Sequence, residues 1–146
     1  MPLLGYRHSN PRRVELVDRL IFEELVHELP VIGAGPRRRG ALAQSVASFI
    51  DTNLDSSLDL NELAERFSIS RRHLTRLFRS EYGVSIGTYI ADRRVDKAKD
   101  LLRSGEAVST AAYEVGFESP SHFARTFRQI VGFSPKEYRH RPQGGR

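Results

Sequence analysis

The sequence contains no cysteine and no tryptophan, and methionine occurs once in 146 residues. The absence of cysteine excludes a disulfide framework, a thiolate nucleophile and a zinc–thiolate site, and it suits a reducing compartment. No apolar run approaches the roughly 20 residues of a membrane span. The first residues, MPLLGYRHSNPRR, lack the apolar core of a signal peptide. We therefore expect a cytoplasmic protein that makes no membrane contact.

Lysine is also scarce, and the net charge of +5 comes mainly from arginine. The length fits one domain or one compact unit with an appendage, and a hydrophobic content of 39% is enough for a core. Residues 41–141 carry fifteen basic and thirteen acidic side chains. A basic surface therefore requires that these nearly balanced charges be sorted onto one side of the domain.

The spacing of apolar residues predicts an all-α fold. Apolar residues at steps of three and four indicate an amphipathic helix over 14–29, and the Gly/Arg-rich stretch 33–40 predicts a linker. From residue 41 onward the same period predicts successive helices, the first over 41–53, and no long stretch alternates with the period of two that a sheet needs. Helix N-caps are predicted at Asp59, Ser70, Ser85 and Ser119, and Ser134-Pro135 is expected to start a final helical turn at 136–139.

The most informative feature is an internal repeat, in which segment 63–85 recurs at 111–134. Two copies are too few for a solenoid, but they suit a duplicated helix-turn-helix. The first unit is predicted at about 60–82, a linker helix at about 85–103, and the second unit at about 108–130. Six pairs match at a separation of 49 positions: His73/His122, Arg76/Arg125, Phe78/Phe127, Arg79/Arg128, Gly83/Gly132 and Ser85/Ser134.

A duplicated helix-turn-helix points to DNA, because the second helix of such a unit lies in the major groove. The second helices are predicted over 70–81 and 119–130. No acidic residue occurs between Arg66 and Ser80, so the first of these segments is uniformly positive. In the second segment Phe123 and Phe127 are expected to point inward, which leaves the polar residues outward.

Arginine can bond guanine through its fork or neutralise a phosphate. Arg76 and Arg125 share one repeat position and are the predicted base contacts. Arg79 and Arg128 lie further along each helix and are predicted phosphate contacts, as are Arg71 and Lys136. An exposed arginine is most often only solvated. Equivalent arginines on duplicated helices are harder to explain in that way.

These residues belong to a longer pattern. Ser70-Arg-Arg-His-Leu-Thr-Arg-Leu-Phe-Arg79 is followed by Gly83-Val-Ser85, and later by the run GFES, HF, RTFR, GFSP and YR between residues 116 and 139. Over about 41–141 the chain resembles the DNA-binding domain of the AraC/XylS family of bacterial transcription regulators.

The resemblance implies about seven helices, with two helix-turn-helix units joined by a long linker helix. It implies that both recognition helices enter adjacent major grooves on one face of double-stranded DNA, with centres about 34 Å apart. RNA polymerase is a second candidate partner, and no cofactor is implied. Pro120 also falls at a family contact position, although it has no donor. The base contacts implied are Arg72, Thr75 and Arg76 in the first unit and Ser121, His122 and Arg125 in the second.

The domain organisation predicted is an N-terminal helix with its linker at 1–40, a DNA-binding domain at 41–141 and a tail at 142–146. Forty residues are too few for the effector-binding domain that many family members carry. The chain is therefore either a stand-alone regulator or a remnant of a larger effector-sensing one. The sequence leaves open whether the chain is a monomer or dimerises through 14–29.

Three other function classes compete with this interpretation. Gly83-Val-Ser85-Ile-Gly87 satisfies the G-x-S-x-G nucleophile pattern, but that motif follows a strand, whereas Ser85 is explained by an N-cap. The five histidines lack metal-ligand spacing. We expect no enzyme and no metal. An RNA-binding module would expose stacking aromatics. A helical adaptor for a protein partner stays open.

Overall fold

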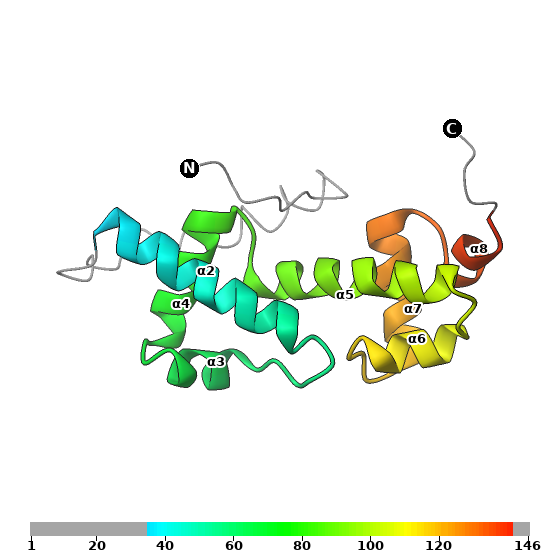
Figure 1. The fold of residues 1–146 in the computed structure, drawn as a ribbon, viewed down its shortest axis with the longest axis horizontal. Helices are drawn as coiled ribbons and strands as arrows, with labels where there is room; N and C mark the ends of the chain where they lie inside the picture. The colour runs from blue at the N-terminus through cyan, green and yellow to red at the C-terminus, as the bar shows by residue number, and fades with distance from the viewer. Residues whose placement is uncertain (1–34, 142–146) are drawn as a thin grey trace. The chain divides into compact units, whose positions relative to one another are not determined.

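The computed structural model describes residues 35–141, and the predicted helix over 14–29 and the tail lie outside them. Within that range the chain forms seven α-helices and no strand (Figure 1). The all-α expectation is confirmed. The helices are α2 (Pro36–Thr52), α3 (Leu60–Arg66), α4 (Arg71–Tyr82), α5 (Ile86–Arg103), α6 (Val108–Glu114), α7 (Pro120–Val131) and α8 (Pro135–His140).

The linker predicted at 33–40 is wrong over residues 36–40, because α2 begins at Pro36. Proline is favoured in a first helical turn, where its missing N–H has no intrahelical partner to lose. The backbone N–H groups of Arg38 and Arg39 donate to the carbonyl oxygen of Gly35 at 3.0 and 3.1 Å and close that first turn. The Gly/Arg-rich residues 36–40 are therefore the start of α2 and not part of a linker.

The described chain forms two compact units. Unit 1 contains residues 35–53 and Leu58–Ile90, and unit 2 contains Leu54–Ser57 and 91–141. The chain passes from one to the other within α5, whose residues 86–90 belong to unit 1. The segment Leu54–Ser57 is short, and it lies between α2 and α3 in sequence while it belongs to unit 2.

Unit 1 is built around α4, which packs against both α2 and α3. Its buried apolar side chains come from each of these helices and from the turn after α4. Phe78 stacks on Tyr82 with the ring centroids 4.6 Å apart. The buried Tyr89 hydroxyl lies 3.0 Å from Oδ2 of Asp51. The hydroxyl group of the buried Tyr89 therefore has a hydrogen-bond acceptor within the unit.

Unit 2 has a core rich in phenylalanine, contributed by the second half of α5 and by α6, α7 and α8. Phe123 and Phe127 are fully buried, as predicted. A chain of ring contacts runs from Phe117 through Phe123 and Phe127 to Tyr138, with centroid separations of 5.2, 5.5 and 5.4 Å. These rings fix α7 against its neighbours, so its outward face has a defined position within the unit.

The repeat in sequence is also a repeat in helix bounds. Ser70 Oγ accepts from the backbone N–H of His73 at 3.0 Å, and Ser119 Oγ accepts from that of His122 at 3.2 Å. Asp59 and Ser85 cap their helices in the same manner, so the four predicted N-caps are confirmed, and Ser134 caps α8 as well. Both α4 and α7 end at a glycine with positive φ, 74° at Gly83 and 92° at Gly132.

No helix within residues 35–141 is both long enough and apolar enough to cross a membrane.

Candidate nucleic-acid interface

The outward face of α4 carries the residues predicted for the first unit. Leu74, Leu77 and Phe78 are buried on the opposite side. Residues three and four apart share a face of a helix, so the predicted residues follow one side of α4. Arg71 and Arg72 are exposed, and Thr75, Arg76 and Arg79 are half-buried.

The outward face of α7 repeats this arrangement. Its buried side is formed by Phe123, Thr126, Phe127 and Ile130. Arg125 occupies the register of Arg76, five positions after the first residue of the helix in each case. The two helices therefore present an arginine at the same place in the same local structure. The predicted residues Ser121, His122, Arg125 and Arg128 are all exposed.

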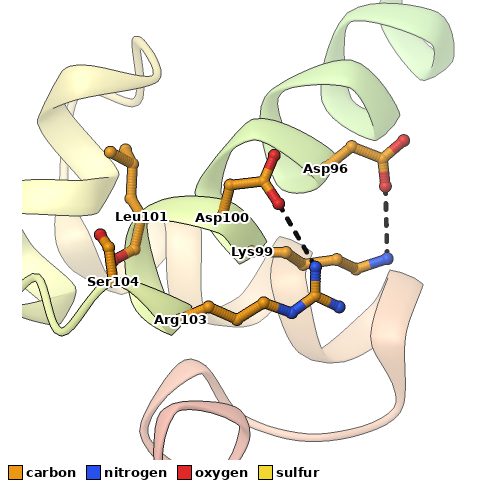
Figure 2. Close-up of polar contacts among 6 residues, drawn as sticks. All are labelled: Asp96, Lys99, Asp100, Leu101, Arg103 and Ser104. Carbon is orange, nitrogen blue, oxygen red and sulfur yellow. Dashed lines mark hydrogen bonds and ion pairs between the residues drawn. The ribbon is translucent and has the colours of Figure 1, made fainter. Parts of the chain in front are cut away.

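Charge distinguishes these two faces from that of the long helix α5. No acidic residue occurs in α7, and none occurs in α4 before Glu81. On α5, Lys99 Nζ lies 3.2 Å from Oδ1 of Asp96 (Figure 2). Arg103 Nη1 likewise lies 3.3 Å from Oδ1 of Asp100. Lys99 and Arg103 are thus paired within α5, and α5 mixes charges of both signs as α7 does not.

The side-chain hydroxyl of Thr75 makes a hydrogen bond within α4. Its hydroxyl donates to the carbonyl oxygen of Arg71 at 2.9 Å. The hydroxyl oxygen still has lone pairs, and the methyl group remains. Thr75 can therefore accept a hydrogen bond from a base or contact a thymine methyl, but it does not donate in this conformation.

The matched arginines Arg79 and Arg128 differ in their surroundings. Arg79 is half-buried, and burial lowers the pKa of its guanidinium. Nη1 of Arg79 donates to the carbonyl oxygen of Gly83 at 2.6 Å. Arg128 is exposed. A guanidinium has five N–H donors, and one of those of Arg79 closes the end of α4.

The His122 ring contacts another aromatic ring on one side. It lies edge-on to Phe117, with the centroids 5.4 Å apart and an interplanar angle of 79°. Its backbone N–H is bonded to the N-cap Ser119, so the first turn of α7 is ordered at this residue. The imidazole is exposed. The matched residue His73 is half-buried.

Lys136 and Pro120 stand in first helical turns. Lys136 is exposed on α8, next in sequence to Glu137. The backbone N–H of Ser134 donates to Oε2 of Glu137 at 2.7 Å, and this bond, with that of the Ser134 side chain, lowers the pKa of Glu137. The carboxylate charge therefore persists beside Lys136. Pro120 is half-buried at the start of α7 and offers only its ring edge.

Comparison with known proteins identifies the family. A model of the helix-turn-helix domain matches residues 63–141, which is more than half of the chain. The multiple antibiotic resistance protein MarA of Escherichia coli (strain K12) is 38% identical over 96 residues, which cover 65% of this chain and 76% of MarA. The chain belongs to the AraC/XylS family.

Two further comparisons agree with this assignment. YfiF, an uncharacterized HTH-type transcriptional regulator of Bacillus subtilis (strain 168), is 39% identical over 100 residues. This AraC-type chain spans only 32% of the length of YfiF, and the match covers 68% of the chain. The DNA-binding domain of the global transcriptional factor AdpA, solved in complex with a target DNA, superposes with a TM-score of 0.65. It is 33% identical, and the match covers 70% of this chain and 97% of that domain.

In the AraC-type chain the G-x-S-x-G pattern has a helical context. Gly83 ends α4, and Ser85 caps α5, with its Oγ accepting from the backbone N–H of Thr88 at 3.1 Å. The nucleophile motif needs a preceding strand, and the described residues contain none. Among the same residues no group of three or more His, Cys, Asp or Glu side chains is placed to hold a metal ion.

Two residues that bear on the interface escaped the sequence analysis. Phe117 stands in the quoted family pattern and Arg94 lies on α5, but neither received a role. Arg94 bonds the segment before α3, and Phe117 packs against His122. Arg94 and Leu54 are 40 residues apart, so no periodic spacing in the sequence indicates their contact. Phe117 and His122 are 5 residues apart, and the only local signal for their contact is the turn before Ser119.

Proposed function

We propose that this AraC-type chain binds a specific double-stranded DNA sequence and regulates transcription, with α4 and α7 in adjacent major grooves. The observation that carries the proposal is the matched pair Arg76 and Arg125. They stand at one register of two helices with equivalent serine caps and glycine ends. The AdpA domain, solved on a target DNA, supports the same role for this chain.

The proposed base contacts use the outward residues of the first turns. Arg76 and Arg125 donate in bidentate fashion to O6 and N7 of guanine, a contact worth about 1–3 kcal/mol of discrimination. Thr75 contributes an acceptor or a methyl contact, because its hydroxyl proton is directed to Arg71. Exposed polar atoms at the remaining positions complete the base-contacting set, which adds Arg72, Ser121 and His122.

The proposed phosphate contacts lie beyond these residues. They supply affinity that depends on salt and not on sequence. Arg79 contributes less than the exposed Arg128, because one of its N–H groups is already bonded to Gly83. The complete set is Arg71, Arg79, Arg128 and Lys136.

We also propose that the chain acts in the cytoplasm, has no catalytic activity and contacts RNA polymerase when it is bound to DNA. The relatives compared above are bacterial transcription regulators or resistance proteins, and transcription in bacteria occurs in the cytoplasm. The mixed charges of α5 leave that helix outside the DNA-contacting set. The chain either works alone or forms part of a larger effector-sensing regulator.

The test is a set of DNA titrations with the duplex that wild type prefers and with random duplexes. Arg76→Ala and Arg125→Ala should each lose about 1–3 kcal/mol of discrimination, roughly 5- to 150-fold, at a guanine in one half of the site. Arg103→Ala, which removes a cation paired on α5, is the matched control and should retain full preference. Unchanged preference in both test variants would contradict the base-contact roles. A wild-type chain that binds no DNA at low salt would favour the helical adaptor.

A further inference from the structure

Arg94 holds a segment that is remote in sequence. It lies on α5 and is half-buried. Its Nε donates to the carbonyl oxygen of Leu54 and its Nη2 to that of Ser56, both at 2.9 Å. These carbonyls belong to the segment Leu54–Ser57 of unit 2. A planar guanidinium suits two acceptors in fixed positions, whereas an ammonium is a point donor.

The same segment is packed tightly against the turn that leads into α7. Gly116 has a φ of 97°, and a Cβ there would collide with the carbonyl oxygen of Leu54. The same Cβ would lie 3.0 Å from Cζ and Nε of Arg94. Both the backbone conformation and the close approach require glycine. Arg94, Leu54 and Gly116 therefore form one closely packed group.

Phe117 connects this group to the surface of α7. Its ring is 6% exposed, and the Arg94 guanidinium carbon lies 5.8 Å from the ring centroid. The same ring packs against Phe123 at 5.2 Å and lies edge-on to the exposed His122 at 5.4 Å. An aromatic ring with neighbours on several sides has little freedom to rotate away. Phe117 therefore limits the positions that the His122 imidazole can adopt.

We propose that Arg94 is a positioning residue for base recognition: through Gly116 and Phe117 it fixes the orientation of His122 without contacting DNA. This inference rests on the proposed function, in which His122 contacts a base. A guanidinium bonded to two backbone carbonyls is poorly placed to reach a phosphate. Burial lowers the pKa of Arg94, and the charges of Asp55 and Glu118 oppose that effect, so the group stays cationic.

The proposal predicts a local change in specificity. Arg94→Lys keeps the charge but cannot hold the Leu54 and Ser56 carbonyls in the same fixed geometry. The imidazole of His122 should then sample more orientations, and discrimination should fall at the base pair that His122 contacts. Base pairs recognised by α4 should be unaffected, because Arg76 lies in unit 1.

The experiment measures binding of the full chain to its preferred duplex and to every single base-pair substitution of it. His122→Ala first identifies the base pair that depends on the imidazole. Arg94→Lys should lower discrimination there by at least threefold, with no change in the α4 half of the site. The double variant should discriminate no worse than His122→Ala alone. Arg103→Lys, a substitution of the same kind on α5, should behave as wild type.

Several results would overturn the inference. The inference fails if Arg94→Lys weakens binding to all duplexes equally, if it lowers discrimination at other base pairs, or if its effect adds to that of His122→Ala. Phe117→Leu, which keeps an apolar side chain but removes the ring edge, provides an independent variant if Arg94→Lys does not fold by circular dichroism. The inference also fails if the Phe117→Leu variant folds and discriminates between base pairs as well as wild type does. If wild type has a preferred sequence but His122→Ala leaves it intact, the inference fails while the proposed function stands. If wild type prefers no sequence, the proposed function itself fails.

Discussion

Arg79 donates from Nη1 to the carbonyl oxygen of Gly83 at 2.6 Å, so a predicted phosphate contact also closes the C-terminal end of α4. Cations near the last carbonyls of a helix are favourable, because these carbonyls lack intrahelical donors and carry partial negative charge. Arg128 stands at the same register of α7 but is exposed. Arg79 therefore combines a structural role with its proposed phosphate contact, and the exposed Arg128 provides the comparison.

Removing these two arginines should have different effects on stability. Arg79→Ala should lower the free energy of unfolding by about 0.5–1.5 kcal/mol, the contribution of a typical hydrogen bond. Arg128→Ala should change it by less than about 0.5 kcal/mol, as expected for an exposed residue. Urea unfolding followed by circular dichroism measures both. Equal losses of stability would contradict the role of the Arg79–Gly83 bond.

The same two variants should weaken DNA binding without altering sequence preference. A phosphate contact contributes equally on every sequence, and its loss reduces the slope of log K against log salt by about 1. Titrations of preferred and random duplexes at several salt concentrations provide the measurement. A change in base preference for either variant would show that its arginine contacts a base instead.

Gly116→Ala should be strongly destabilising. Gly105 is the matched control, because its φ of 98° is nearly the same but a Cβ there meets no atom within 4 Å. Gly105→Ala should cost about 1–2 kcal/mol for the left-handed backbone alone. Gly116→Ala should cost clearly more, since its Cβ collides with Leu54 as well. Thermal or urea unfolding compares the two, and equal losses would show that the packing against Leu54 is not required.

Glu137 should make stability depend on acid pH. Its pKa in the folded chain lies below the usual value of 4.5, mainly because the backbone N–H of Ser134 donates to it. Its contribution is therefore complete above that usual value and is lost as the pH falls through the lowered pKa. Glu137→Gln can keep a capping bond but does not titrate. Its melting temperature should lie below that of wild type at pH 7, with the difference shrinking at pH 3.

The control for this pH effect is Glu106→Gln, which removes an exposed carboxylate outside any capping box. It should follow the acid profile of wild type. A difference between wild type and Glu137→Gln that stays constant from pH 7 to pH 3 would contradict the role of the Glu137 charge.

The sequence was sufficient for the helices from residue 60 to residue 140 because their signals are local. A serine or aspartate cap lies within three residues of the N–H from which it accepts, so the caps from Asp59 to Ser119 could be predicted. The apolar face of α7 likewise follows from spacing. The start of α2 was misplaced, since proline and glycine are typical of both a linker and a helix start. Only the bonded turn at Gly35 distinguishes the two.

The support of the candidate interface could not be predicted in the same way. The repeat singled out Arg76 and Arg125, because equivalence within the sequence is itself visible. The bonds from Arg94 to Leu54 and Ser56 span about 40 residues, and no periodicity connects them. The different surroundings of Arg79 and Arg128 were also hidden, since the two residues match in the repeat.

The most direct test of the account is selection of binding sites by the full chain from a random pool of duplexes. The account predicts one enriched, asymmetric sequence with two informative blocks centred about one helical turn, or 10 base pairs, apart. Arg76→Ala should erase one block and Arg125→Ala the other. Recovery of no enriched sequence, or of a single short block that survives both substitutions, would contradict the claim that two matched helices recognise DNA.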